Sequence, residues 1–236
     1  MTRDAPLIKR IKRHVTGRTR DFFVATAPGL EPLCLEELKG LSATVSDAAV
    51  VPGGVEFKGR MQTCYLANLH LRTASRVLMR IGTFKASNFR QHESKMTGFP
   101  WELYLHRNET PEVKVSTRHS RLYHGTAIEE RSKDCIEKRL SRYGLQPPEG
   151  SVKSCNQQVY IRVKEDRFTL SLDSSGDILH KRGIKKTRAV APIRETIAAA
   201  VHAWCRITPG PASNDFPRRQ SRQESSPGKG PGRYSG

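Results

Sequence analysis

Residues 159–183 read VYIRVKEDRFTLSLDSSGDILHKRG, and this stretch decides the fold of the chain. Two runs in it, residues 159–163 and 168–172, alternate apolar with polar side chains as half-buried strands do. The charged residues 164–167 between the two runs are typical of a turn. The stretch therefore predicts a β-hairpin, followed by a polar segment that leads into basic residues.

The sequence before the hairpin predicts one more strand and one long helix. Residues 111–117 alternate like a strand, and a helix is expected from Thr126 to about residue 144, where Gly144 ends it. Thr126 and Glu129 have the spacing of a capping box, which predicts that Thr126 caps this helix. The apolar positions of the helix form a stripe that should be buried, namely Ile128, Cys135, Ile136 and Leu140.

Further upstream, the pattern predicts a separate small unit. Strands are expected at residues 22–26 and 55–59, helices at residues 31–40 and 61–71, and a last strand at residues 76–82. Two short apolar runs between residues 43 and 51 predict strand structure before the turn at residues 52–54. This order predicts an antiparallel sheet with helices on one face, so the fold class is α+β.

The charge of the chain points to a polyanionic partner. The formal net charge is +18 and the pI is about 10.1, so the field of the protein attracts phosphate. Residues 1–20 carry a net charge of +6, residues 181–188 carry +5 and residues 207–236 carry +3. These three segments therefore hold +14 of the net charge. Residues 1–20 are expected to form a disordered basic arm, since they hold few apolar side chains and many like charges.

Two classes of protein are disfavoured by the sequence. No window approaches the roughly 20 apolar residues of a membrane span, and no apolar signal region follows the basic start, so a cytoplasmic location is expected. The five cysteines are odd in number and widely spaced, which argues against a disulfide framework or a zinc knuckle. They are expected to be reduced structural thiols.

The loop between the strand at residues 111–117 and the following helix is a candidate phosphate site. It holds Arg118, His119, Arg121 and His124 just before a helix N-terminus, where free N–H groups and the helix dipole favour anions. A solvated loop is the alternative interpretation.

The run KVSTRHSRLYH at residues 114–124 resembles the matching segment of THUMP domains in bacterial large-subunit rRNA guanine-N2 methyltransferases. Further landmarks of that family occur in the right order, at residues 27–31, 53–59, 75–80 and 173–200, and the resemblance covers about residues 22–206. It implies a ferredoxin-like domain followed by a THUMP domain, which together present RNA to a Rossmann-like methyltransferase domain. Residues 173–200 would then form the join to that catalytic domain.

The domains are expected as follows: a basic arm at 1–20, a ferredoxin-like domain at 21–75, a THUMP domain at 76–180, a basic linker and helix at 181–206, and a disordered tail at 207–236. The basic cluster at residues 181–188 lacks acidic residues and is expected to contact phosphate. The RNA-binding residues expected from the loop, the adjoining strand and this cluster are Lys114, Arg118, His119, Ser120, Arg121, His124, Lys181, Arg182, Lys185, Lys186 and Arg188.

The motifs of a methyltransferase are missing from the sequence. S-adenosylmethionine is the methyl donor of the intact family, but no glycine-rich turn follows a strand here, and no Asn-Pro-Pro-Tyr-like segment occurs. No catalytic, cofactor or metal residue is expected, and the chain alone is expected to be inactive. The composition after residue 206 suggests a frameshifted tail in place of the catalytic domain.

The sequence thus favours binding of structured RNA, 23S-type rRNA in particular, as the recognition part of a methyltransferase. Two alternatives remain open: an intact enzyme of another kind, and a standalone RNA-binding adaptor that docks a separate catalytic subunit. In the adaptor or in the split enzyme, a methyltransferase domain would contact the apolar side of the last helix, formed by Ile193, Ile197, Val201 and Trp204.

Overall fold

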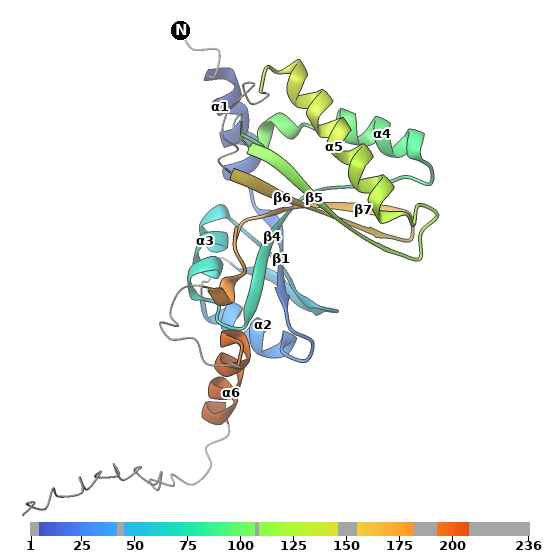
Figure 1. Ribbon diagram of the computed structural model, residues 1–236. Helices are drawn as coiled ribbons and strands as arrows, with labels where there is room; N and C mark the ends of the chain where they lie inside the picture. Colours follow the sequence, from blue (N-terminus) through green and yellow to red (C-terminus); the bar gives the residue numbers. More distant parts are fainter. Residues whose placement is uncertain (1–4, 42–44, 107–108, 146–154, 182–192, 208–236) are drawn as a thin grey trace, which may run out of the picture.

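The computed structural model describes residues 5–41, 45–106, 109–145, 155–181 and 193–207 (Figure 1). Within these ranges, seven strands form one sheet in the order β2-β3-β1-β4-β7-β6-β5. No helix among the described residues is long and apolar enough to cross a membrane. The strands are β1 (Arg20–Thr26), β2 (Ser46–Val51), β3 (Gly54–Gly59), β4 (Ala74–Lys85), β5 (Glu109–Arg118), β6 (Cys155–Lys164) and β7 (Arg167–Asp173).

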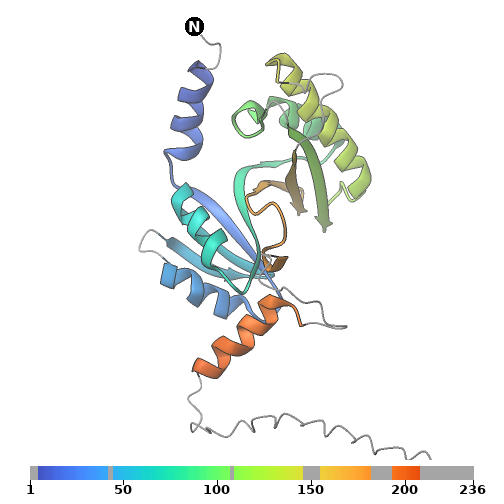
Figure 2. The same ribbon diagram turned by 60° about the vertical axis from the view of Figure 1, so that its left-hand side comes forward.

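The first unit contains β1 to β4 with two helices, α2 (Glu31–Leu41) and α3 (Met61–His70). Its strands pair antiparallel in the order β2-β3-β1-β4, which with the βαββαβ sequence of elements is a ferredoxin-like arrangement. The helices lie side by side on one face of these strands (Figure 2). Phe22 and Phe57 are buried and stack at 5.1 Å between their ring centroids. The expected α+β class and the antiparallel sheet with helices on one face are confirmed.

The second unit contains β5 to β7 with the helices α4 (Phe89–Gly98) and α5 (Gly125–Arg142), and a short 3-10 turn, η2 (Trp101–Leu103), follows α4. β6 and β7 form the expected hairpin, with Glu165 and Asp166 in its turn at φ values of 51° and 59°. β5 runs parallel to β6, and α5 lies between them in the chain as the crossover that a parallel pair requires. The expected stripe on α5 is buried: Ile128, Cys135, Ile136 and Leu140.

β4 joins the two units because it pairs with β1 through its first half and with β7 through its second (Figure 1). Its pairing with β7 skips Ile81, so one extra residue forms a bulge between Arg80 and Gly82. The bulge reverses the alternation of side chains along the strand, since Arg80 faces away from the helices while Phe84 stacks on buried Phe168. A Cβ added at Gly82 would lie 2.6 Å from the Phe99 ring, so any larger residue there would force that ring to move.

The start of α5 differs from the expected capping box. The helix begins at Gly125, and its N-cap residue is His124, without a capping hydrogen bond from the side chain. Thr126 therefore lies inside the first turn, and the expectation that Thr126 caps the helix is wrong. The reason is that the chain already turns into the helix at Gly125, so that the backbone carbonyl of His124 accepts from the N–H of Ile128 at 3.1 Å.

The N-terminal segment also differs from the expected disordered arm, because residues 5–16 are helical. α1 (Ala5–Ile11) continues into a short π-helical turn, η1 (Lys12–Thr16), in which Val15 is buried. Leu7, Ile11 and Val15 repeat at intervals of four residues and pack against the core, a pattern that the high charge of the segment masks.

An ion-pair cluster fixes this N-terminal helix to the second unit. Glu102 is buried, and its carboxylate accepts two hydrogen bonds of 3.0 Å from Arg139 and one of 3.2 Å from Arg10 on α1. Burial alone raises the pKa of Glu102, but the bonds from Arg139 and Arg10 hold it below the usual value. The carboxylate therefore stays charged and paired between α5 and α1.

A second buried titratable group, His92 on α4, lies between α5 and the sheet. Its Nε2 lies 3.1 Å from the Ser132 hydroxyl on α5, and its ring packs 5.1 Å from that of Phe168. Burial lowers the pKa of His92 from 6.5 to about 4. The neutral imidazole is therefore the form that the fold accommodates.

His92 should make the protein less stable in mild acid. Its folded pKa lies below its unfolded value, so the unfolded chain binds more protons between pH 6.5 and 4, and the free energy of unfolding falls as the pH falls through that window. The limiting slope for one such group is about 1.4 kcal/mol per pH unit. Urea unfolding of His92→Leu between pH 7.5 and 4 should show a shallower slope than wild type, although its stability at pH 7 is reduced.

The matched control is His70→Leu, at an exposed position on α3. Its pH dependence should follow that of wild type. Equal slopes for His92→Leu and wild type would contradict the assignment.

Candidate nucleic-acid interface

The side of the sheet away from the helices, here called the open face, carries a basic surface. Strand register aligns its side chains in rows that cross four strands. One row places Lys114, Tyr160, Ser171 and Arg80 side by side. A second row aligns the cations Arg118, Lys164, Arg167 and Lys85, and Arg162 lies between the two rows.

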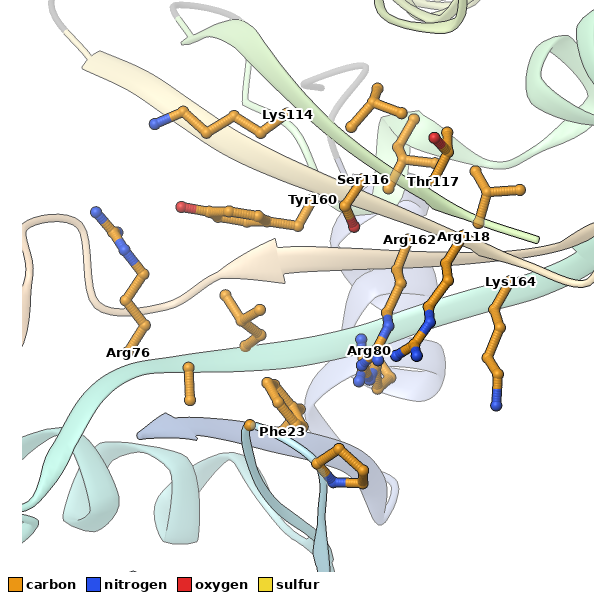
Figure 3. A pocket seen from close by; sticks show the side chains of 17 residues that line it. Phe23, Arg76, Arg80, Lys114, Ser116, Thr117, Arg118, Tyr160, Arg162 and Lys164 are labelled. Carbon is orange, nitrogen blue, oxygen red and sulfur yellow. The ribbon is translucent and has the colours of Figure 1, made fainter. Parts of the chain in front are cut away.

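The open face is hollowed where the two units meet, and Figure 3 shows the side chains around this central hollow. Its volume is about 560 Å³, within the range of pockets that enclose small ligands. Of the described residues that line it, none is acidic. Six are basic, namely Arg76, Arg80, Lys114, Arg118, Arg162 and Lys164, and two are aromatic, Phe23 and Tyr160.

A second depression, here called the lateral hollow, adjoins the central one and has a volume of about 480 Å³. The two share Arg80, Arg118, Arg162 and Lys164. The lateral hollow adds Lys85 and Arg167, while Glu56 and Glu165 are the carboxylates among its described lining residues. The two hollows together form a basic trough across β4, β7, β6 and β5.

Some cations of the trough have partners within the protein. Arg76 pairs with the buried carboxylate of Asp173, and Lys114 pairs with Glu112 at 3.4 Å. Arg80 donates to Glu56 at 3.1 Å and to the Ser171 hydroxyl at 2.9 Å. These contacts fix the positions of the three side chains and neutralise part of their charge.

Other cations of the trough have no such partner among the described residues. Arg118, Arg162 and Arg167 make no side-chain hydrogen bond or ion pair with any residue in the described part of the chain, and all three are exposed. Partial burial lowers the pKa of Arg80, and the positive charge of Arg162 lowers it further, although Glu56 opposes both effects. The trough therefore holds uncompensated positive charge, which favours an anionic ligand.

Of the residues predicted from sequence, Lys114 and Arg118 lie in the trough. His119, Ser120, Arg121 and His124 lie in the loop that follows β5. The hairpin turn holds this loop, because Asp166 accepts from the Arg121 N–H at 2.8 Å and its own N–H donates to Ser120 at 3.2 Å. Ser120 and Arg121 thus have structural contacts.

The basic cluster predicted at residues 181–188 is described only at its first residue. Lys181 ends a short 3-10 turn, η3 (Leu179–Lys181). The other predicted cations of the cluster, Arg182, Lys185, Lys186 and Arg188, lie outside the described residues, as does the tail from residue 208.

Several residues of the trough were missed by the sequence analysis: Phe23, Arg76, Arg80, Tyr160, Arg162 and Lys164. A signal for part of this set was present. Tyr160 and Arg162 occupy alternate positions of a predicted strand, so they had to share one face. Lys164, which was expected in the turn, extends this face because β6 continues to Lys164. Arg76 and Arg80 lie on β4, and the sequence does not show which strands pair with β4.

The segment after β7 links the two units. Asp173 is buried and pairs with Arg76 on β4, and it also accepts from the N–H of Ser175 at 2.9 Å. The Ser174 hydroxyl donates to the Val77 carbonyl at 2.7 Å, and the Ser175 hydroxyl donates to Asn68 of α3 at 2.7 Å. The polar sequence DSSG therefore holds the end of β7 against the first unit.

Comparison with known proteins agrees with this architecture. The family described as the RlmL ferredoxin-like domain matches residues 21–78. The ribosomal RNA large subunit methyltransferase K/L of Syntrophotalea carbinolica is 35% identical over 180 residues, which are 76% of this chain and 25% of that protein. The enzyme of the same name from Methylococcus capsulatus is 32% identical over 183 residues, or 78% of this chain and 24% of that protein.

Solved structures share the fold as well. A protein from Listeria monocytogenes described as a predicted N6-adenine-specific DNA methylase has a TM-score of 0.70 at 31% identity, over 79% of this chain and 48% of that one. SMU.472, described as a methyltransferase and crystallised with SAH, has a TM-score of 0.68 at 30% identity, over 79% and 49% of the two chains.

These matches show that residues 21–78 are similar to the RlmL ferredoxin-like domain and that most of the chain shares the fold of part of larger methylase proteins. The chain carries the RlmL ferredoxin-like domain and is homologous to the N-terminal part of the rRNA methyltransferases K/L. It spans about a quarter of the length of these curated relatives.

Proposed function

We propose that this chain binds structured RNA, large-subunit rRNA in particular, as the substrate-recognition part of an S-adenosylmethionine-dependent guanine-N2 methyltransferase. The observation that carries the proposal is the central hollow, which six cations and no carboxylate line among the described residues. Cations fixed on a rigid sheet can contact successive phosphates of a folded RNA. The similarity to rRNA methyltransferases K/L supports RNA as the polyanion.

The binding surface in this proposal extends beyond the trough. The loop residues His119, Arg121 and His124 lie directly after Arg118 at the end of β5, and they would contact RNA at the rim of the trough. The basic residues at 181–188 would add phosphate contacts, since they form an unbroken cationic run. The domain limits proposed for this protein are residues 21–75 for the ferredoxin-like domain and 76–180 for the THUMP domain, with β4 as the strand that they share.

The described residues do not fit the methyl donor. The turns that lead from β1, β3, β4 and β5 into the next helix lack the glycine spacing with which a methyltransferase backbone approaches S-adenosylmethionine. The described part of the chain also has no group of three His, Cys, Asp or Glu residues placed to hold a metal ion. We therefore assign RNA binding, and no step of methyl transfer, to these residues.

RNA affinity should depend on the trough more than on total charge. Replacing Arg118, Arg162 and Lys164 with Ala should lower the affinity for a structured large-subunit rRNA fragment at least about tenfold, since these cations have no buried partner among the described residues. The slope of log affinity against log salt should fall by about 2 to 3, because each lost phosphate contact removes roughly 0.7–0.9. A salt titration of binding measures both quantities.

The matched control replaces three exposed cations of the N-terminal helix, Lys9, Lys12 and Arg13, with Ala. This variant loses the same charge and should lose less affinity. Equal losses in the two triple variants would mean that non-specific polycation attraction explains the binding.

The last helix, α6 (Glu195–Ile207), offers a separate surface for a methyltransferase domain. It lies at the end of the molecule away from α4 and α5 (Figure 1), with Ala200 buried on its inner side. Its outer side exposes Ile197 and Val201, and Ile193 and Trp204 extend this apolar stripe. We propose that this stripe packs against a methyltransferase domain, either in the same polypeptide or in a separate subunit.

This contact can be measured by calorimetry with the residues that follow the matched region in the Syntrophotalea carbinolica relative, supplied as a separate domain. Replacing Ile197 and Val201 with Ser should weaken the association about tenfold or more, because two apolar side chains lose their buried contacts. His202→Ser, on an exposed polar position of the same helix, is the control. Unchanged association of the double variant would exclude this face.

A further inference from the structure

Three arginines from three strands converge at the boundary between the central and lateral hollows. Arg80 comes from β4, Arg118 from β5 and Arg162 from β6, and all three line both hollows. In Figure 3 the side chains of Arg118 and Arg162 extend toward Arg80. This arginine cluster holds three like charges near one another.

We propose that the arginine cluster seats one phosphate group of a single-stranded RNA segment and that an adjoining base enters the central hollow. This inference rests on the proposed function and specifies the form of RNA that the trough binds. It is argued from the anchoring of Arg80, the lining of the two hollows and the depth of the site.

The anchoring of Arg80 prepares it for a phosphate. Its guanidinium donates to Glu56 and Ser171, so the side chain is held in place while other N–H groups stay available. Glu56 is the carboxylate that contacts the cluster, so the charges of Arg118 and Arg162 lack a contacting counter-ion among the described residues. Guanidiniums bind phosphate oxygens through paired N–H groups, which makes a phosphate the matching ligand.

The two hollows suit different parts of a nucleotide. The central hollow offers apolar and aromatic surface, with Phe23, Leu78 and Tyr160 among its lining residues. The lateral hollow adds the cations Lys85 and Arg167. Bases of unpaired RNA stack on aromatic rings, while the backbone follows cationic grooves. A strand would therefore place its base over Tyr160, since the Arg80 guanidinium already covers the Phe23 ring, and would continue its phosphates along the lateral hollow.

The depth of the site favours an unpaired strand over a duplex. The Arg80 side chain is only 13% exposed, and its guanidinium lies 4.7 Å from the centre of the Phe23 ring on the sheet surface. A phosphate must come down to the strands to reach it. The backbone of an A-form helix is stiff and its bases are already stacked, so a duplex can touch the rim of the trough but cannot fill the central hollow.

Fluorescence anisotropy with labelled RNA tests this inference. The intact chain is titrated at 150 mM salt against an unpaired nine-nucleotide RNA, the same RNA paired with its complement, and the unpaired RNA carrying a 5′-phosphate. We expect the unpaired RNA to bind about tenfold more tightly than the duplex. Tighter binding of the 5′-phosphorylated RNA would identify a terminal phosphate as the seated group, and equal binding would identify an internal one.

Two pairs of variants locate the site on the open face. Arg162→Ala should weaken binding of the unpaired RNA about tenfold, and Arg162→Lys should recover only part of it, because an ammonium cannot donate in pairs. Tyr160→Leu should weaken it similarly through lost stacking, whereas Tyr65→Leu, at an exposed tyrosine on α3, should not. A thermal melt of each variant excludes unfolding as the cause.

The outcomes distinguish failure of the proposed RNA binding from failure of the proposed single-strand site. If neither nine-nucleotide form binds while the structured rRNA fragment does, the single-strand site is overturned. If the structured rRNA fragment does not bind either, the proposed function itself fails. If the duplex binds as well as the unpaired RNA, or if Arg162→Ala and Tyr160→Leu weaken both forms equally, the single-strand seat is overturned while RNA binding stands.

Discussion

The arrangement of the molecule depends on the bulge in β4. β4 continues from one unit into the other, and its first half needs Val77 and Met79 in the core of the ferredoxin-like unit. Its second half needs Phe84 against Phe168 in the other core. A regular strand could not meet both requirements, because side chains alternate strictly. The extra residue at Ile81 reverses the alternation and keeps Arg80 and Lys85 on the same open face.

The same strand explains why the basic trough lies at the junction of the units. β1 and β3 supply Phe23 and Glu56 from one side, and β5 and β6 supply Arg118 and Arg162 from the other. The Arg76–Asp173 pair and the serines after β7 hold the two sides together. The helices cover the opposite face, so the open face is the side of the sheet that a large ligand can reach.

Much of this fold follows from local sequence patterns. The alternation in residues 159–172 predicted the hairpin, and the apolar spacing of Ile128, Ile136 and Leu140 predicted the buried side of α5. The N-terminal helix was missed because a stripe of only three apolar side chains, Leu7, Ile11 and Val15, is surrounded by cations, and its anchor at Glu102 is far away in the sequence.

The site was only partly predictable, because its residues come from segments that lie far apart in the sequence. The sequence pointed to Lys114, Arg118 and the loop after them, since local charge and a helix start are visible in one segment. The convergence of Arg80, Arg118 and Arg162 depends on the strand order β4-β7-β6-β5, which no single segment specifies. Long-range strand pairing therefore decided the composition of the trough.

Ultraviolet cross-linking of a uridine-containing rRNA fragment, followed by mass spectrometry of the peptides, tests the central claim most directly. If the open face binds RNA, cross-links should fall on the peptide that contains Tyr160, the aromatic residue of the central hollow that Arg80 does not cover. Cross-links confined to peptides from the helical side, such as those with Tyr65 or Tyr143, would contradict the account.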